Sequence, residues 1–76
     1  MEQPLAETIR REIRAEMARQ RVTHRRLGEQ LGISQQQTSS RLSGTVEFRP
    51  SELEKVAELL GVPVSQFIQQ PASSAA

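Results

Sequence analysis

The stretch THRRLGEQLGISQQQTSSRLSG, residues 23–44, carries the signals of two short helices joined by a tight turn. Thr23 and Ser34 are good N-cap residues, because a hydroxyl oxygen can accept a hydrogen bond from a free backbone N–H in the first turn of a helix. Gly32 and Gly44 suit the left-handed conformation that commonly ends a helix. The spacing therefore predicts two consecutive helices, over 24–31 and 34–43.

The second of these helices is unusually polar for so small a protein. Ser34 and Gln37 match a capping box, in which the side chain of each residue bonds to the backbone N–H of the other. Leu42 is the single large aliphatic residue of this helix, and Thr38 lies one turn before it on the same face. The remaining glutamines and serines add little to a core, but they can both donate and accept hydrogen bonds.

Apolar spacing before residue 23 predicts a longer helix. Ile9, Ile13 and Met17 recur every four residues, which is the pattern of an amphipathic helix and places it over 5–19. Gly28 lies in the middle of the predicted 24–31 helix, where glycine is unfavourable relative to alanine. A close approach by another helix at that position would explain the missing side chain.

Two further helices are predicted after the polar helix. Ser51 and Glu54 form a second capping box, and apolar residues at helical spacing continue from there to Gly61. Pro63 suits the start of a last short helix, because proline is favoured at the first helical position. The large apolar residues of this last helix are Val64, Phe67 and Ile68.

These elements predict an all-α fold, a compact five-helix bundle that contains a helix-turn-helix over 24–43. A chain of 76 residues forms one domain. We place this domain over residues 5–69, between a flexible N-terminal segment, 1–4, and a disordered C-terminal tail, 70–76.

The composition argues against several classes of function. The chain has no cysteine and one histidine, so it predicts no disulfide and no metal centre built from thiolates or imidazoles. It also lacks aspartate and tyrosine, and no nucleophile–base pair can be assembled, so we predict no enzyme activity, cofactor or small-molecule ligand. The apolar runs are too short for a membrane span or a signal peptide, and we expect a cytoplasmic protein.

Positive charge is concentrated in the first part of the chain. Residues 1–49 contain nine arginines and six glutamates, a net charge of +3, whereas residues 50–76 contain one lysine and three glutamates, a net charge of −2. Arginine can bind phosphate oxygens through two parallel hydrogen bonds. Charge alone is compatible with a polyanion-binding surface or with a solvated face, and we expect Arg10, Arg11 and Arg14 to be solvated.

The polar helix has the chemistry of a DNA reader. Glutamine can present a donor and an acceptor together to the edge of adenine in the major groove, and serine can bond to a base edge or a phosphate. The side chains available for base contacts are Gln35, Gln36, Gln37, Ser39 and Ser40. Free N–H groups at the two helix starts, 23–25 and 34–36, can receive phosphate oxygens. We therefore predict double-stranded DNA as the partner.

The segments VTHRRLGEQLGISQQQTSSRLSG, residues 22–44, and RPSELEKVAELLGVPVSQFI, residues 49–68, resemble the Cro/repressor-type helix-turn-helix family of phage and bacterial transcription regulators. The resemblance implies a lambda-repressor-like domain of five helices whose third helix reads DNA. It implies base contacts by Gln35, Gln36 and Ser40. Contacts to the DNA backbone are implied for Thr23, His24, Ser43 and Thr45. From their positions at helix starts or in the following loop, we add Arg25, Ser34 and Arg49.

Three positions depart from the family pattern. His24 stands where a glutamine commonly contacts a phosphate and braces the first base-reading side chain. Thr38 takes a position that is normally valine or isoleucine. Arg41 takes one that is often apolar, so we expect Leu42 to carry more of the packing.

The leading hypothesis is a sequence-specific transcriptional regulator, Cro-like or a small phage-type or prophage-type repressor, that binds an operator. It would act as a monomer or as a homodimer, formed in solution or only on DNA. The candidate dimer contacts are Val64, Phe67 and Ile68, which could equally close the monomer core. The alternative is a protein-interaction module, antitoxin-like or an adaptor, that uses the acidic fourth helix. Its candidate contacts are Glu52, Glu54 and Glu58.

Overall fold

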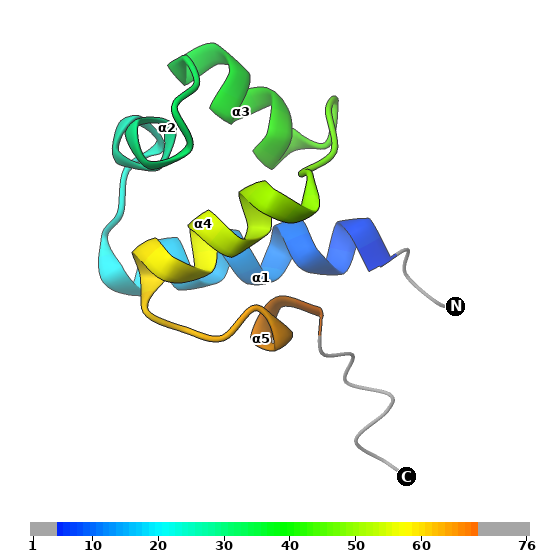
Figure 1. The fold of residues 1–76 in the computed structure, drawn as a ribbon. Helices are drawn as coiled ribbons and strands as arrows, with labels where there is room; N and C mark the ends of the chain where they lie inside the picture. Colours follow the sequence, from blue (N-terminus) through cyan, green and yellow to red (C-terminus); the bar gives the residue numbers. More distant parts are fainter. Residues whose placement is uncertain (1–4, 69–76) are drawn as a thin grey trace, which may run out of the picture.

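Helices dominate the computed structural model, which describes residues 5–68. The five helices of this range are α1 (Leu5–Gln20), α2 (His24–Leu31), α3 (Gln35–Ser43), α4 (Pro50–Leu60) and α5 (Ser65–Ile68) (Figure 1). Residues 5–68 contain no strand, so the predicted all-α, five-helix fold is confirmed. The predicted flexible segment 1–4 and the tail 70–76 lie outside the described residues, as does residue 69.

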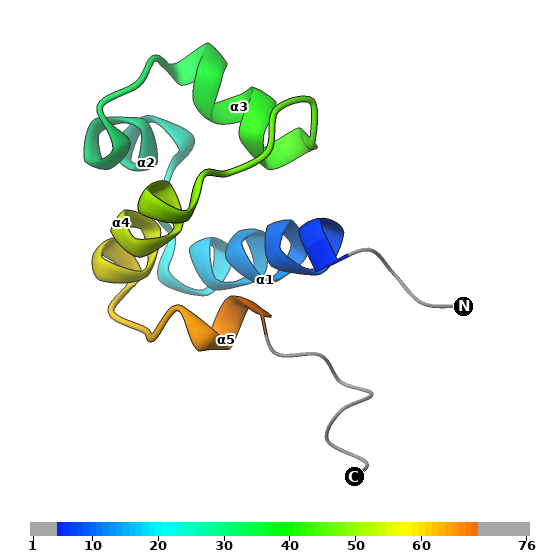
Figure 2. The same ribbon diagram turned by 45° about the vertical axis from the view of Figure 1, so that its right-hand side comes forward.

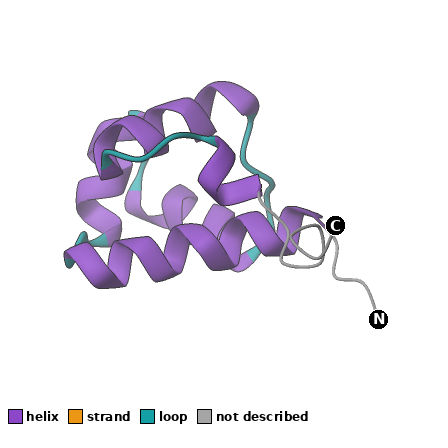
Figure 3. Ribbon diagram, turned by 90° about the horizontal axis from the view of Figure 1, so that it is seen from below, coloured by secondary structure: helices purple, strands orange, loops and turns teal. Residues whose placement is uncertain are grey.

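The helices form a small bundle around an aliphatic core. α4 packs on both α1 and α2, α5 lies along α1, and α3 packs on α2 and α1 (Figures 1 and 2). Seen from below, only short loops separate these helices (Figure 3). The buried apolar side chains are Ile13, Met17, Leu27, Leu31, Leu42, Val56, Ala57, Leu60 and Phe67. Every helix therefore contributes at least one side chain to a single core.

The helix-turn-helix has the caps that the sequence predicts. The Thr23 hydroxyl accepts a hydrogen bond from Arg26 N, at 3.0 Å. Both bonds of the Ser34–Gln37 capping box are present, at 3.0 and 3.1 Å. Gly32 ends α2 with a φ of +72°, a left-handed conformation that glycine adopts without steric cost. Local hydrogen bonding thus defines the start of each helix and the turn between them.

The predicted close approach at Gly28 is also present. A Cβ atom on Gly28 would lie 2.7 Å from the Thr38 hydroxyl oxygen and 3.1 Å from the Ile33 carbonyl oxygen. Thr38 has no exposed surface, and its hydroxyl donates to the Ser34 carbonyl, at 2.9 Å. Thr38 therefore fills the space that a side chain on Gly28 would need, and its hydroxyl group keeps a hydrogen bond.

The last two helices begin at different residues from those predicted. α4 starts at Pro50 with Arg49 as its N-cap, and Glu52 rather than Glu54 bonds back to the cap, through Arg49 N at 2.9 Å. Proline fits the first helical position because it has no N–H to leave unbonded, so the N-cap lies two residues before the predicted one, at Arg49 instead of Ser51. α5 begins at Ser65, after a turn in which the Pro63 carbonyl accepts from Gln66 N.

Candidate nucleic-acid interface

The outer face of α3 consists of uncharged polar side chains. Gln35, Gln36 and Ser39 are exposed, and Ser40 is half-buried. The residues that face inward are Thr38, Arg41 and Leu42. At 100° per residue, Gln36 and Ser40 lie opposite this buried stripe. The helix therefore presents amide and hydroxyl groups to its surroundings while its other side is held against the bundle.

Gln37 is less available than its neighbours. It is exposed, but its Oε1 accepts the hydrogen bond from Ser34 N, and the Ser34 hydroxyl in turn accepts from Gln37 N. These two predicted contact residues therefore hold the start of α3. The donors that remain for a ligand are the amide N–H groups of Gln37 and the hydroxyl hydrogen of Ser34.

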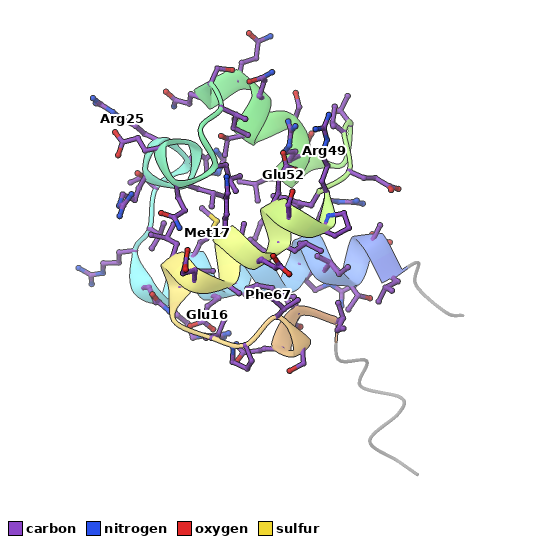
Figure 4. All side chains as sticks on the ribbon, in the orientation of Figure 1. Glu16, Met17, Arg25, Arg49, Glu52 and Phe67 are labelled. Atoms are coloured by element: carbon purple, nitrogen blue, oxygen red, sulfur yellow. The ribbon has the colours of Figure 1, made fainter. Side chains whose placement is uncertain are left out.

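His24 and Arg25 lie at the exposed start of α2. His24 Nδ1 is 3.4 Å from Ser39 Oγ, so the histidine approaches Ser39 and not the first base-reading candidate, Gln35. Arg25 extends away from the bundle (Figure 4) and is 3.7 Å from Glu29 Oε2, with both side chains largely exposed. An exposed pair of this kind contributes little to stability, so Arg25 can change partners at low cost.

A second group of predicted contacts meets at the C-terminal end of α3. Ser43 Oγ is 3.2 Å from Thr45 Oγ1 and 3.1 Å from the Ser40 carbonyl oxygen. Ser43 and Thr45 are both exposed, and Gly44 between them has a φ of +99°. The two hydroxyl groups therefore form an exposed hydroxyl corner at the C-terminal end of α3, opposite the end that carries Gln35.

A buried ion pair that the sequence did not predict joins α3 to α4. Arg41 Nε is 2.9 Å from Glu52 Oε1, and the two side chains are 9% and 11% exposed. The same carboxylate oxygen accepts from Arg49 N, and Arg41 Nη1 donates to the Gln37 carbonyl. Glu52 points from α4 toward α3 (Figure 4). The proposed use of Glu52 as a partner contact is therefore wrong, because the carboxylate is buried against α3.

The surroundings of Glu52 also fix its charge. Burial raises the pKa of the Glu52 carboxyl, but the hydrogen bonds from Arg41 and from Arg49 N outweigh burial, so its pKa lies below the ordinary value. The carboxylate is therefore ionised at neutral pH and pairs with Arg41, which is itself buried.

Two arginines of α1 reach the end of α3, where we had expected solvated side chains. Arg14 Nη1 donates to the Leu42 carbonyl, and the Arg10 guanidinium lies so close to Gly44 that a Cβ there would be 2.8 Å from Arg10 Cζ. For Arg10, which is half-buried, the expectation is wrong, because α1 passes under the last turn of α3. Arg14 is exposed as expected, although one of its N–H donors is used within the fold. Cations at this end of a helix also stabilise its carbonyl groups.

The candidate dimer contacts separate into two kinds. Phe67 has no exposed surface and points from α5 into the bundle (Figure 4), so its proposed role as a dimer contact is wrong and it closes the monomer core instead. Val64 is half-buried, and Ile68 is 43% exposed. Of the three residues, Ile68 has the most surface to offer a second protein.

Residues 5–68 contain no group of three or more histidine, cysteine, aspartate or glutamate side chains that could hold a metal ion. In this same range, no helix combines the length and the apolar character that crossing a membrane requires.

A family model described as a helix-turn-helix domain matches residues 8–67, which include most of α1 and nearly all of α5. The chain belongs to this helix-turn-helix domain family. Membership supports the general class of DNA-binding regulators, in which two consecutive short helices present one helix to the duplex. No significant match to this helix-turn-helix protein was found among curated proteins or solved structures.

Proposed function

We propose that this helix-turn-helix domain is a sequence-specific regulator of transcription, of the Cro/repressor type, that reads double-stranded DNA with α3. The observation that carries the proposal is the division of α3 into two sides. Thr38, Arg41 and Leu42 bury one side against the bundle, whereas Gln36, Ser39 and Ser40 form a polar outer side, and Gln35 is exposed at the first position of the helix. A helix of this kind fits the major groove better than it fits a protein core.

The exposed groups suit the two kinds of contact that a DNA reader makes. Gln35 and Gln36 are the candidates for adenine edges, with Ser39 and Ser40 as further base contacts. Thr23–Arg25 at one side of α3, and the hydroxyl corner of Ser43 and Thr45 at the other, would bind phosphates and set the register of the helix. Arg49, exposed at the end of the loop before α4, would add a further phosphate contact.

The finer features of the proposal follow from this mode of binding. When bound to an operator, the domain would block access of the transcription machinery to an overlapping promoter. This is repression of the Cro-like kind, and we place it in the cytoplasm, where the DNA lies. Two copies on a palindromic site would have half-sites about one helical turn apart, with Ile68 and Val64 as the candidate dimer contacts. We propose no enzymatic role.

Selection of bound sites from random duplex DNA tests this function directly. The expected result is an enriched motif of a few base pairs, repeated with inverted symmetry if two copies bind, and an affinity that falls steeply as salt rises. If no sequence is enriched but binding still depends on salt, the protein binds DNA without sequence specificity, and the proposed operator recognition is wrong. No binding to any duplex at low salt would reject the proposal.

The alternative, a protein-interaction module, would appear in the same experiment as the absence of DNA binding. The structure weakens its chemical basis, because Glu52 is buried and Glu58 Oε1 is within 3.4 Å of Gln30 Nε2. Of the three acidic residues that we proposed for this role, Glu54 alone is exposed without a hydrogen bond or ion pair to the described residues.

A further inference from the structure

On the basis of the proposed DNA-binding function, we infer that α1 supplies a phosphate-binding row, Arg10 and Arg14, alongside the helix-turn-helix. Neither residue belongs to the contacts expected from α2, α3 or the loop that follows them. The row lies under the C-terminal end of α3 and would bind the DNA backbone there, with no preference for base sequence.

The position of Arg14 places it on the face that includes the start of α2. Arg14 and His24 line the same surface hollow, of about 220 Å³, between α1 and α2. The Arg14 guanidinium reaches the Leu42 carbonyl in the last turn of α3. A single side chain of α1 thus spans from the proposed phosphate contacts at the start of α2 to the end of the reading helix.

Arg10 extends the row by one turn. It precedes Arg14 by four residues and therefore lies on nearly the same face of α1. Its guanidinium packs against Gly44, whose neighbours Ser43 and Thr45 form the exposed hydroxyl corner. A phosphate bound by these hydroxyl groups would also lie beside the Arg10 guanidinium.

The charges of this row are not neutralised within the domain. The acids Glu16, Glu29 and Glu52 pair with arginines elsewhere in the fold, on α1, α2 and α3 respectively. Arg10 and Arg14, in contrast, have no ion pair with any residue of 5–68. Glu47 and Arg10 both line a second hollow, but no nitrogen of the Arg10 guanidinium lies close enough to a Glu47 carboxylate oxygen to form an ion pair.

Stabilisation of the α3 C-terminus explains only part of this arrangement. A guanidinium has five N–H donors, and Arg14 uses one of them on the Leu42 carbonyl. Arg10 donates no hydrogen bond to the described residues, although it is half-buried. The remaining donors are available to phosphate oxygens, which bind guanidinium groups in a forked geometry. The contact with α3 orients the arginines, and the free donors bind the ligand.

The test compares Arg10→Gln, Arg14→Gln and the double variant in titrations of a random-sequence duplex and of the selected operator over a range of salt concentrations. Each lost phosphate contact should reduce the slope of log K against log salt by about 0.9, so the double variant should lose about 1.8. The affinity for the random-sequence duplex and the affinity for the operator should fall by the same factor, because phosphate contacts carry no sequence information.

Two control variants separate this effect from general charge and from folding. Lys55→Gln removes one positive charge from the exposed face of α4 and should leave the slope at the wild-type value. Arg14→Lys keeps the charge and should keep the slope. Thermal unfolding of each variant without DNA shows whether the end of α3 has lost support.

Each outcome has a distinct meaning. If the double variant keeps the wild-type slope, the inference is overturned while the proposed DNA-binding function stands. A loss of affinity for the operator alone, at unchanged slope, would also overturn it, since the arginines would then act only as supports of α3. If the wild-type protein binds neither duplex at low salt, the proposed function itself fails.

Discussion

Gly28 of α2 and Thr38 of α3 are complementary in shape, since the Thr38 hydroxyl oxygen would be 2.7 Å from a Cβ atom on Gly28. The missing side chain on one helix makes room for the buried side chain of the other. This contact sets how closely α3 packs on α2, and therefore how far the exposed glutamines stand from the rest of the domain.

Gly28→Ala should destabilise the domain. Overpacking a buried site costs about 1–3 kcal/mol, while alanine gains up to about 1 kcal/mol in helix propensity. We expect a net loss of up to about 3 kcal/mol in the free energy of unfolding, measured by urea denaturation. In a Thr38→Ala background the same substitution should cost less, with a coupling above about 0.5 kcal/mol. Equal costs in the two backgrounds would show that the two residues do not compete for space.

The Arg41–Glu52 pair should be more sensitive to the loss of one partner than to the loss of both. Glu52→Ala leaves a buried guanidinium without its carboxylate, and breaking a buried pair in this way costs about 3–5 kcal/mol. The double variant Arg41→Met with Glu52→Leu should lose less stability than Glu52→Ala alone. Urea denaturation of the single and double variants measures the difference, and a double variant less stable than Glu52→Ala would contradict the expectation.

Acid should destabilise the fold through the same carboxylate. The pKa of Glu52 is lower in the folded protein than in the unfolded chain, so its contribution is complete above the unfolded pKa, about 4.3, and is lost as the pH falls through the folded value. We expect the free energy of unfolding to fall below about pH 4 in the wild type. Glu52→Gln should show a smaller fall over that interval, whereas an identical pH dependence would exclude Glu52 as a source.

A second acid contributes in the same direction. Hydrogen bonds from Arg19 and Gln20 lower the pKa of Glu16, so some acid sensitivity should remain in the Glu52→Gln variant. Adding Glu16→Gln should reduce that remaining pH dependence. A series of urea denaturations between about pH 3 and pH 7, a range that spans the carboxyl pKa values, would measure the reduction.

Gln35→Ala and Gln36→Ala should change DNA recognition without changing the fold. Both side chains are exposed and make no hydrogen bond to residues 5–68, so the unfolding temperature should stay close to that of the wild type. Each substitution should reduce discrimination at one or two operator base pairs by about 1–3 kcal/mol. Ser51→Ala, on the exposed face of α4, serves as the control. Two glutamine variants with unchanged operator preference would show that α3 is not the reader.

Local signals predicted much of the fold. The caps at Thr23, Ser34 and Gly32 each depend on atoms within a few residues along the chain, and all three are present. The predicted Ser51–Glu54 capping box was wrong. Arg49 and Glu52 have the same N-cap-to-N3 spacing on either side of Pro50, and the contact of Glu52 with Arg41 favours that start for α4.

The candidate site was predictable to the extent that it lies on one helix. The side of α3 that carries Gln36, Ser39 and Ser40 follows from helical periodicity once the buried stripe is known. Gln35 lies near Leu42 by periodicity and is exposed because it is the first residue of the helix. The parts that were missed or wrongly assigned all join distant segments. They are the Arg41–Glu52 pair, the contacts of Arg10 and Arg14 with the end of α3, and the burial of Phe67.

The sequence by itself determined that this chain forms five short helices with a polar helix third among them, because capping and periodicity act over three or four residues. Only the tertiary structure decided which charged side chains are exposed and which are used within the fold. Arg41 is buried with an acid partner, whereas Arg10 has no ion pair within residues 5–68. That difference depends on where α1 and α4 cross α3, and the packing of the shared core sets those crossings.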